Sequence, residues 1–525
     1  MLFLIGFMAA GKSTVGREMS SRTGRLFVDL DDEIAAMGEP VAALVKRDEA
    51  EFRRREAAAL ANVIARGQDI VVATGGGAAT FGDNLERMRA AGTVIALDVD
   101  VATAQQRAAG GGERPLLANA AALAAARAPF YRRAHAVVST TGKSISNVVA
   151  DAEAAEAIAK KYPGATVLAL GDRSYAIPVV TSAFDSTLLA PVLGTASKIA
   201  IITDDNVAQF WLPSLRKVLP LAEVIDVHPG EASKSFAVYE RVCSELIAKG
   251  LDRGSAIVAL GGGVIGDLAG FVAATLFRGI PIVQIPTTLV AMTDAAIGGK
   301  TAVDLPAGKN LVGAFWQPRL VACGLETLTT LPARERRAGF GELWKYALLD
   351  GPAMWSAVDA CTSWAAGPEG TPAPLALSEV IARAVAYKAV VVGRDELERT
   401  GVRALLNLGH TIGHAIETAA GLTAEPLLHG ECVGLGLLAA CRVSAAVVGT
   451  RTTLEAEVRD ALQRSGLPTE IDRWLRADVL DRVGVDKKRI GTSVKFIVAR
   501  EVGQCEPLAI DITDVRRILR ANPAG

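Results

Sequence analysis

The chain has 525 residues, with 56 lysines and arginines against 57 aspartates and glutamates, so its formal net charge is -1. At about 100 to 200 residues per domain, this length predicts about three domains and excludes a single compact one. The balanced charge argues against a nucleic-acid partner, and no uncharged apolar run reaches the roughly 18 residues of a membrane span. The apolar start, residues 1–6, has no basic segment before it, which favours a buried strand over a signal peptide. We therefore expect a cytoplasmic protein with neither nucleic acid nor membrane as partner.

The six cysteines form no C-x-x-C pair, and none occurs in the first 242 residues. This distribution argues against a disulfide framework or a thiolate zinc site. We expect buried, reduced thiols at Cys243, Cys323, Cys361, Cys432, Cys441 and Cys505.

A phosphate-binding motif follows the first predicted strand. Residues 6–13 read Gly-Phe-Met-Ala-Ala-Gly-Lys-Ser, which matches G-x-x-x-x-G-K-[ST] and precedes a helical segment. In such a loop, backbone N–H groups surround the nucleotide phosphates, while Lys12 reaches the β and γ oxygens and Ser13 ligates Mg²⁺. The motif predicts a site for ATP with Mg²⁺.

An acidic cluster comes next, in residues 27–32. If this segment is a strand, Asp29 and Asp31 project to the same side near the loop, where one assists Mg²⁺ and the other holds a hydroxyl. Taken alone, such a cluster is more typical of a solvated helix start.

Four further motifs follow in order: Glu51-Phe52-Arg53, the Gly75-Gly76-Gly77 loop after a strand at 70–73, Arg114-Pro115-Leu116-Leu117, and Arg127 with Tyr131. Together with the P-loop they resemble shikimate kinase, an α/β P-loop fold, over residues 1–150. The resemblance implies phosphorylation of shikimate, with Arg114 on a lid over ATP and Asp31 orienting the hydroxyl and accepting its proton. One departure is Ala9, where the family usually has glycine, because alanine disfavours positive φ.

The resemblance implies three sets of residues in this domain. Those that bind ATP and Mg²⁺ are Gly6, Gly11, Lys12, Ser13, Thr14, Asp29 and Arg114. Those that bind shikimate are Asp31, Arg53, Gly75, Gly76, Gly77 and Arg127. Those that take part in catalysis are Lys12, Asp31 and Arg114.

The rest of the chain divides by pattern. Residues 151–164 form a predicted linker, a short Ala-rich helix ended by Tyr-Pro-Gly. From 165 to 330, apolar runs such as 199–202, 256–260 and 282–285 alternate with helical stretches, which predicts a parallel, Rossmann-like α/β domain. From 331 to 525 helical spacing dominates, which predicts a mostly α-helical domain.

Residues 261–267, Gly-Gly-Gly-Val-Ile-Gly-Asp, match G-x-G-x-x-G between a strand and a helix. The match alone is weak, since no acidic residue follows about 20 positions later to take the ribose hydroxyls. An acidic candidate stands upstream instead, at Asp204 after the strand at 199–202.

Three of the five histidines, His410, His414 and His429, fall within 20 residues. The first two lie one helical turn apart, which suits two ligands or one ligand and one substrate contact. Glu342 stands in an apolar stretch, where an unpaired carboxylate is costly. A metal site explains this set, although hydrogen-bonded core histidines explain any one of them.

Residues 165–515 resemble 3-dehydroquinate synthase. The shared segments are 230–234, 261–267, 286–288, 298–301, 308–310, Glu342 with Lys345, and the histidine segments. The resemblance implies Zn²⁺ or Co²⁺ on Glu342, His410 and His429, with His414 facing the substrate phosphate. It also implies bound NAD⁺, and a homo-oligomer formed through this module, because Arg278 reaches a neighbouring subunit's site. A departure is Ala295-Ala296, where serines are usual.

The same resemblance implies the remaining site residues. Contacts with NAD⁺ come from Asp204, Asn206, Glu231, Lys234, Gly262, Gly263, Val264, Asp267, Thr287, Thr288 and Lys309. Contacts with the heptulosonate phosphate come from Asp294, Lys300, Asn310, Lys345, Lys388, Arg403, Asn407, His414, Lys487 and Arg278. The catalytic residues among them are Lys345, His414 and Arg278.

The implied reaction cyclises 3-deoxy-arabino-heptulosonate 7-phosphate to 3-dehydroquinate with loss of phosphate and no net redox change, because NAD⁺ is regenerated. The substrates of both modules are therefore small molecules. Two alternatives remain open: a metal- and NAD-dependent polyol dehydrogenase or another sugar-phosphate cyclase in the larger module, and a non-catalytic nucleotide-binding module at the N-terminus.

Overall fold

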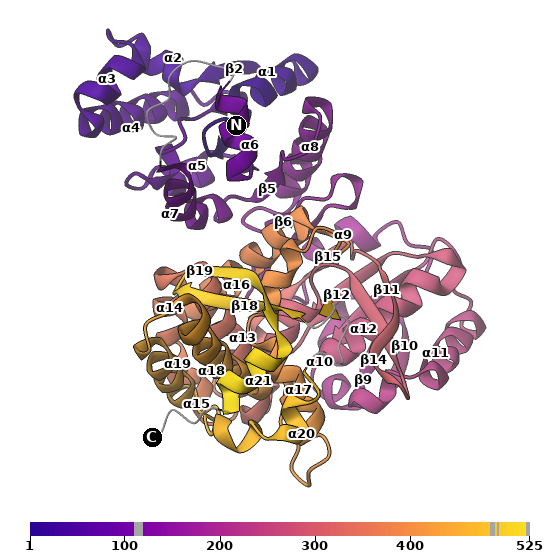
Figure 1. The fold of residues 1–525 in the computed structure, drawn as a ribbon. Coiled ribbons are helices and arrows are strands. Elements are labelled where there is room, and N and C mark those ends of the chain that lie inside the picture. Colours follow the sequence, from indigo (N-terminus) through magenta and orange to yellow (C-terminus); the bar gives the residue numbers. More distant parts are fainter. Residues whose placement is uncertain (110–118, 484–488, 491–492, 521–525) are drawn as a thin grey trace. The chain divides into compact units, whose positions relative to one another are not determined.

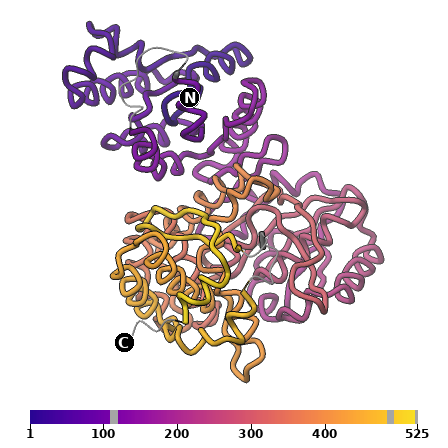
Figure 2. The backbone as a smooth tube through the Cα atoms, viewed as in Figure 1, coloured from indigo at the N-terminus to yellow at the C-terminus, as the bar shows by residue number. Residues whose placement is uncertain are grey.

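The computed structural model describes residues 1–109, 119–483, 489–490 and 493–520 (Figure 1, Figure 2). The chain divides into two compact units, Met1–Pro178 and Val179–Gly525. Helix α8 (Ile145–Lys161) covers most of the segment that the sequence pattern assigns to a linker, and it belongs to the first unit.

The first unit is built on a sheet whose strands pair in the order β7-β6-β5-β4-β1-β3-β2. All neighbours are parallel except β6 and β7. The strands are β1 (Leu2–Gly6), β2 (Leu26–Asp29), β3 (Ile70–Ala73), β4 (Thr93–Asp98), β5 (Ala136–Ser139), β6 (Thr166–Leu168) and β7 (Tyr175–Ile177). The helices besides α8 are α1 (Lys12–Thr23), α2 (Leu30–Ala35), α3 (Val41–Arg47), α4 (Glu49–Ala65), α5 (Asn84–Ala91), α6 (Val101–Ala109) and α7 (Ala120–Arg132).

Alternate residues of β1 enter two different cores. Leu2 and Leu4 pack with Met19 of α1 on one face, while Phe3 and Ile5 pack with Leu60 of α4 on the other. Helices therefore cover both faces of a mostly parallel sheet, as the P-loop fold requires. The phosphate loop follows β1 at its carboxyl end, where α/β sheets bind ligands.

The first half of the second unit is a parallel sheet in the order β10-β9-β11-β12-β15. The strands are β9 (Ile199–Asp204), β10 (Glu223–Val227), β11 (Ala256–Gly261), β12 (Ile282–Pro286) and β15 (Leu320–Val321). Its helices are α9 (Ser186–Leu193), α10 (Asp205–Val218), α11 (Phe236–Ala248) and α12 (Gly263–Thr275). A short pair, β8 (Val179–Val180) with β16 (Cys323–Gly324), and an antiparallel hairpin, β13 (Lys300–Leu305) with β14 (Gly308–Phe315), complete it. The predicted Rossmann-like domain is confirmed.

The second half is the predicted helical domain. Its helices are α13 (Ala333–Asp350), α14 (Pro352–Asp359), α15 (Thr362–Ala366), α16 (Leu375–Arg394), α17 (His410–Ala420), α18 (His429–Val448), α19 (Thr453–Arg464), α20 (Ala477–Leu480) and α21 (Ile512–Arg520). Helix α18 is long and apolar enough to cross a membrane, but 72% of that stretch is buried within the protein. It is a core helix, packed against α13 and α17.

The helical pattern did not predict a small antiparallel sheet near the C-terminus. It consists of β17 (Arg489–Ile490), β18 (Ser493–Glu501) and β19 (Gln504–Asp511). The turn between the two long strands contains Gly503 at a φ of 87°. Val494 and Phe496 alternate with the more exposed Ser493 and Lys495 at the start of β18, and from Phe496 to Ala499 every residue is buried, so the alternation is too short to stand out among long helices.

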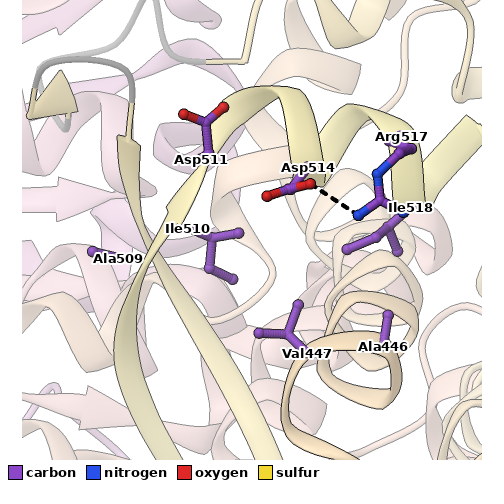
Figure 3. A pocket seen from close by; sticks show the side chains of 8 residues that line it. All are labelled: Ala446, Val447, Ala509, Ile510, Asp511, Asp514, Arg517 and Ile518. Carbon is purple, nitrogen blue, oxygen red and sulfur yellow. Dashed lines mark hydrogen bonds and ion pairs between the residues drawn. The ribbon is translucent and has the colours of Figure 1, made fainter.

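A pocket lies at the end of α18 that is far from His429 (Figure 3). It is lined by Ala446, Val447, Ala509, Ile510, Asp511, Asp514, Arg517 and Ile518. None of these lining residues is a predicted site residue. At 1.5 Å per residue, about 27 Å of helix separates Val447 from His429.

The six cysteines are all free, as expected from their spacing. Four of them are buried as predicted, but the expectation of burial is wrong for Cys243 and Cys505, which are only half-buried.

Candidate active sites

The phosphate loop of the first unit connects β1 to α1. Gly11 caps α1 at a left-handed φ of 94°, which glycine adopts without strain. Lys12 Nζ donates hydrogen bonds to the carbonyl oxygens of Gly6 (2.9 Å) and Phe7 (3.0 Å), and so lies over its own loop. Ser13 Oγ donates to Asp29 Oδ2 at 2.7 Å, which brings together the two predicted Mg²⁺ ligands. The neighbouring Thr14 is exposed on α1.

The expectation that Asp29 and Asp31 share one strand is wrong. Strand β2 ends at Asp29, which caps α2, and Asp31 lies in the first turn of that helix. The two remain close, because Asp29 Oδ1 accepts the Asp31 backbone N–H at 3.2 Å. Loss of water around the Asp31 carboxylate and repulsion from Asp29 raise the pKa of Asp31.

Ala9 adopts a φ of 58°, the left-handed conformation that favours glycine. The alanine at this position therefore holds a strained backbone conformation. Arg107 of α6 donates to the Ala9 carbonyl oxygen at 3.4 Å and to the Thr140 carbonyl oxygen at 2.9 Å. Sequence reasoning missed Arg107, which no motif marks.

The Gly75–Gly77 loop is closed in by charged side chains. A side chain at Gly77 would overlap the Arg53 guanidinium, one at Gly75 would overlap Glu56, and one at Gly76 would crowd Arg127. Glycines are needed here because these groups converge on the loop.

Glu56 is buried, and one of its oxygens accepts from Arg53 Nη1 at 2.7 Å while the other has no hydrogen-bond partner among the described residues. Burial raises the pKa of Glu56 despite the nearby Arg53. Tyr131 donates to the Gly76 carbonyl oxygen at 2.5 Å, and burial raises its pKa to about 12. Glu56 was not predicted, although its spacing of three residues from Arg53 places both on one face of α4. Arg114 and Lys487 lie outside the described residues.

The glycine loop of the second unit follows β11 and opens α12. The backbone of Thr287, just after β12, donates to the Gly261 carbonyl oxygen at 3.0 Å, so the ends of the two strands lie together. A side chain at Gly262 would crowd Thr288, and one at Gly263 would crowd Ala295. The alanine at 295, where the family usually has serine, therefore packs against the glycine loop. Val264, the next residue of the loop after Gly263, is half-buried.

Asp204 ends β9 and caps α10, accepting the Val207 N–H at 3.1 Å, while Asn206 is exposed. Burial raises the pKa of Asp204. The carboxyl ends of β9, β11 and β12 thus meet at one edge of the sheet, the usual crevice for a dinucleotide.

Lys234 and Asp267 form a second part of this edge. Lys234 Nζ lies 2.8 Å from Asp267 Oδ2 and 3.5 Å from Glu231 Oε1, and it also donates to Asn310 Oδ1. Burial raises the pKa of Asp267 to about 6, although the adjacent ammonium opposes the shift. The resemblance assigns Asn310 to the sugar phosphate and Lys234 to NAD⁺, and the structure brings these two side chains into contact. Asn310 adopts a left-handed backbone conformation, with a φ of 55°.

Three helices bring together Glu342, His410 and His429. His410 Nε2 lies 3.3 Å and His429 Nε2 3.2 Å from Glu342 Oε1, and one ligand atom from each residue lies within 4.8 Å of the others. The close approach depends on glycines: a side chain at Gly341 of α13 would overlap the Gly430 carbonyl, and one at Gly430 of α18 would overlap the Ala338 carbonyl.

These residues suit a divalent metal. Glu342 is 0% exposed, and within the part of the chain that the structure describes neither of its carboxylate oxygens has a hydrogen-bond partner, although Lys345 Nζ forms an ion pair with it. Burial alone would raise the pKa of Glu342, but the Lys345 ammonium and the two histidines outweigh burial, and the pKa lies well below its ordinary value. One carboxylate and two imidazoles are a typical zinc donor set with a position left open.

A group of cations surrounds Asp294, which lies in the short helical segment Ala291–Ala295 after β12. Lys388 Nζ lies 2.7 Å and Lys345 Nζ 3.8 Å from Asp294 Oδ1, and Tyr346 OH donates to it at 3.4 Å. Burial lowers the pKa of Lys388 to about 8 despite Asp294. Lys345 is 0% exposed, and its ammonium group pairs with Glu342 and Asp294 and lies 4.6 Å from the centroid of the Tyr346 ring.

Glu398 links two other predicted substrate contacts. Lys300 Nζ forms an ion pair with it, and Arg403 Nε lies 3.7 Å from Glu398 Oε1. Arg403 also donates to the Gly298 carbonyl oxygen at 3.2 Å. Asn407 is half-buried at the end of the short helical segment Val402–Asn407, which also contains Arg403, and it lies three residues before His410.

His414 lies one turn after His410 on α17, as predicted, with the two ring centroids 5.3 Å apart. Arg278 is exposed at a φ of 68°, and its role across subunits stays a prediction. Two carboxylates near the metal ligands were not predicted. Glu417 contacts His429 Nδ1 at 3.0 Å and Lys309 Nζ at 3.2 Å, and Glu431 pairs with Arg334 at 2.8 Å.

The two units thus define a class of protein: a P-loop phosphotransferase unit followed by an enzyme unit with a nucleotide-binding sheet and a carboxylate-histidine metal site. Comparison with known proteins agrees in both parts. Residues 8–161 match the family model for shikimate kinase, and residues 224–338 and 339–489 match those for the N- and C-terminal parts of 3-dehydroquinate synthase.

The 3-dehydroquinate synthase of Caulobacter vibrioides is 42% identical over 345 residues, which cover 64% of this chain and 92% of the relative. The structure of 2-epi-5-epi-valiolone synthase from Streptomyces hygroscopicus, with NAD⁺ and Zn²⁺ bound, has a TM-score of 0.56 and 25% identity, and covers 64% of this chain and 93% of its own. That of 2-deoxy-scyllo-inosose synthase, with NAD⁺ and Co²⁺, shares the fold at a TM-score of 0.59 and 23% identity, over 68% of this chain and 99% of its own. The chain belongs to the 3-dehydroquinate synthase family, and a shikimate kinase domain precedes that part.

Proposed function

We propose that the chain is a bifunctional enzyme of the shikimate pathway. The first unit transfers a phosphoryl group from MgATP to shikimate, and the second cyclises 3-deoxy-arabino-heptulosonate 7-phosphate to 3-dehydroquinate with release of phosphate. The observation that carries the second activity is the convergence of Glu342, His410 and His429 from three helices beside buried lysines. The family matches over both units support the pairing.

In the first unit, catalysis is mainly positioning and charge neutralisation. Arg53 and Arg127 offer two guanidinium groups, which suit the two oxygens of the shikimate carboxylate. Asp31 orients the attacking hydroxyl, and its raised pKa favours acceptance of the proton. Lys12 leaves its loop carbonyls to neutralise the transferring phosphoryl group, together with Arg114.

In the second unit, a divalent ion such as Zn²⁺ or Co²⁺ on Glu342, His410 and His429 supplies Lewis-acid polarisation of hydroxyls, and NAD⁺ supplies reversible hydride acceptance. Lys345 and Lys388 compensate negative charge that develops beside this site, and Asp294 holds both ammonium groups in place. Lys300, Arg403 and His414 bind the acidic groups of the substrate. The glycine loop after β11 lets the backbone approach the dinucleotide.

Two assays on the full chain test the proposal. Shikimate with MgATP should yield ADP, and the heptulosonate phosphate with catalytic amounts of NAD⁺ and a divalent metal should yield inorganic phosphate. Steady accumulation of NADH with a simple polyol would instead support a dehydrogenase. Absence of ADP formation would leave the first unit as a nucleotide-binding module. A cytoplasmic location and a homo-oligomer formed through the second unit remain part of the proposal.

A further inference from the structure

The proposed reaction gives no role to Glu417, a carboxylate in contact with a metal ligand. Glu417 lies on α17, and with His410 and His414 it occupies positions i, i+4 and i+7, so all three share one face of the helix. Its side chain is 22% exposed, compared with 34% for His429. One ligand atom each of Glu417, His414 and His429 lies within 4.8 Å of the others, so the carboxylate is close enough to affect how these two rings are oriented.

The contacts of His429 define what Glu417 does. Nδ1 of His429 lies 3.0 Å from Glu417 Oε2, and Nε2 of the same ring lies 3.2 Å from Glu342 Oε1. A neutral imidazole has one N–H and one lone pair, and an ionised carboxylate only accepts hydrogen bonds. The proton of the metal-binding tautomer therefore belongs on Nδ1, where it is donated to Glu417, and the lone pair on Nε2 faces Glu342 and His410.

The other ligand histidine shows the same arrangement with a different acceptor. Nδ1 of His410 lies 3.1 Å from the Leu408 carbonyl oxygen, while its Nε2 faces Glu342. Both ligand rings thus have an acceptor on Nδ1. Glu417 is itself fixed, because its Oε1 lies 3.2 Å from Lys309 Nζ, on the β13–β14 hairpin.

We propose that Glu417 is a positioning residue for the metal site: it holds the His429 ring in the orientation and tautomer that bind the ion, and Lys309 fixes Glu417 in turn. The inference rests on the proposed function, since it presumes an ion on Glu342, His410 and His429. It assigns Glu417 no contact with the ion. Carboxylates in this role raise the basicity of the ligand and restrict its rotation.

A competing arrangement uses the same residue as a ligand. His414, Glu417 and His429 also place one ligand atom each within 4.8 Å of the others. An ion there would take Nδ1 of His429 away from Glu417 and would add a second equivalent of metal per chain. Stoichiometry therefore separates the two arrangements.

The test uses full-length protein stripped of metal, with the dissociation constant for Zn²⁺ measured by competition with a chromophoric chelator and the Co²⁺ absorption spectrum recorded in parallel. Glu417→Gln should weaken Zn²⁺ binding by about 10- to 100-fold, keep one equivalent of metal per chain, and shift the Co²⁺ bands. The matched control is Glu425→Gln, which removes one negative charge from an exposed position between α17 and α18. The control should stay within about two-fold of wild type.

Equal affinities for wild type and Glu417→Gln would overturn the inference, as would two equivalents in wild type and one in the variant. If Glu417→Gln does not fold, Glu417→Asp serves instead: its shorter side chain withdraws from Nδ1, so an unchanged affinity would overturn the inference equally. Failure of the proposed function gives a different result, because Glu342→Gln would then bind Zn²⁺ as tightly as wild type.

Discussion

Single residues decide the local geometry of both sites, and they differ in how far sequence reveals them. Lys12, Ser13 and the trio of Glu342, His410 and His429 were predictable, because their chemistry is rare in the chain or tied to a motif. Glu56 and Glu417 were not, because each acquires a role only from partners that the fold brings to it. The burial of His135 is likewise a property of the folded chain, whereas the P-loop pattern already pointed to Ala9 as a position where alanine is unfavourable.

Ala9→Gly should stabilise the first unit. A left-handed φ costs an alanine about 1–2 kcal/mol, and the greater freedom of glycine in the unfolded chain offsets about 0.5–1 kcal/mol of that gain. The free energy of unfolding, measured by pulse proteolysis in urea, should rise by about 0.5–1 kcal/mol. Ala10→Gly is the control, because Ala10 is buried and is not among the residues with positive φ; this change should destabilise. Equal effects of the two changes would argue against strain at Ala9.

The buried His135 should make the first unit sensitive to acid. Burial and repulsion from Arg89 lower its pKa to about 4 from an ordinary 6.5, and its Nδ1 accepts the Val94 N–H at 2.9 Å. The unfolded chain therefore binds a proton that the folded chain refuses, and stability falls by about 1.4 kcal/mol per unit as the pH drops from 6.5 toward 4. His135→Asn keeps an acceptor and loses the titration. Its urea midpoint should depend less on pH than that of wild type, and parallel slopes for the two proteins would contradict the assignment.

At the scale of elements, the sequence patterns located the parallel strands well and the helix crossings poorly. Strands such as β9, β11 and β12 are continuous apolar runs with glycine turns after them, a pattern that few other structures produce. The hairpin of β18 and β19 was missed because its alternation is short and lies among helices. The crossings of α13, α17 and α18 depend on small residues far apart in sequence, including Gly341, Gly430 and Gly436.

Gly430→Ala should therefore disrupt the metal site. Its added methyl group would overlap the Ala338 backbone carbonyl, which can move only if α13 and α18 separate, and this should weaken Zn²⁺ binding at least ten-fold and cost about 1–3 kcal/mol of stability. Gly434→Ala, on the same helix, meets only the flexible ends of side chains, Leu462 at 3.1 Å and Leu467 at 3.9 Å, and should cost less than about 1 kcal/mol. Tryptophan fluorescence reports on this unit alone, because all six tryptophans follow residue 178. Similar losses in both variants would contradict a role for the crossing.

At the scale of the whole molecule, the chain consists of two compact units, each with its own core and its own set of chemistry-bearing residues. This organisation was predictable because each set of motifs occupies a separate stretch of sequence. The position of the boundary was less so, since α8, β6 and β7 belong to the first unit although their composition marks a change of domain.

Independent units should lose activity independently. Lys12→Ala removes the charge that neutralises the transferring phosphoryl group, so kinase activity should fall by about a hundred-fold or more while cyclase activity stays within about two-fold of wild type. Glu342→Gln should give the reverse pattern. Both steady-state assays on the same preparations measure this, and parallel loss of the two activities in either variant would show that the units are coupled.

The most direct measurement is the position of the metal ion in crystals of the full chain, located by anomalous scattering at the zinc or cobalt edge. We expect one peak per chain, within about 2.0–2.2 Å of a Glu342 oxygen and of Nε2 of both His410 and His429. A peak bound elsewhere, or one that leaves Glu342 outside bonding distance, would contradict the assignment of the second unit as a metal-dependent cyclase.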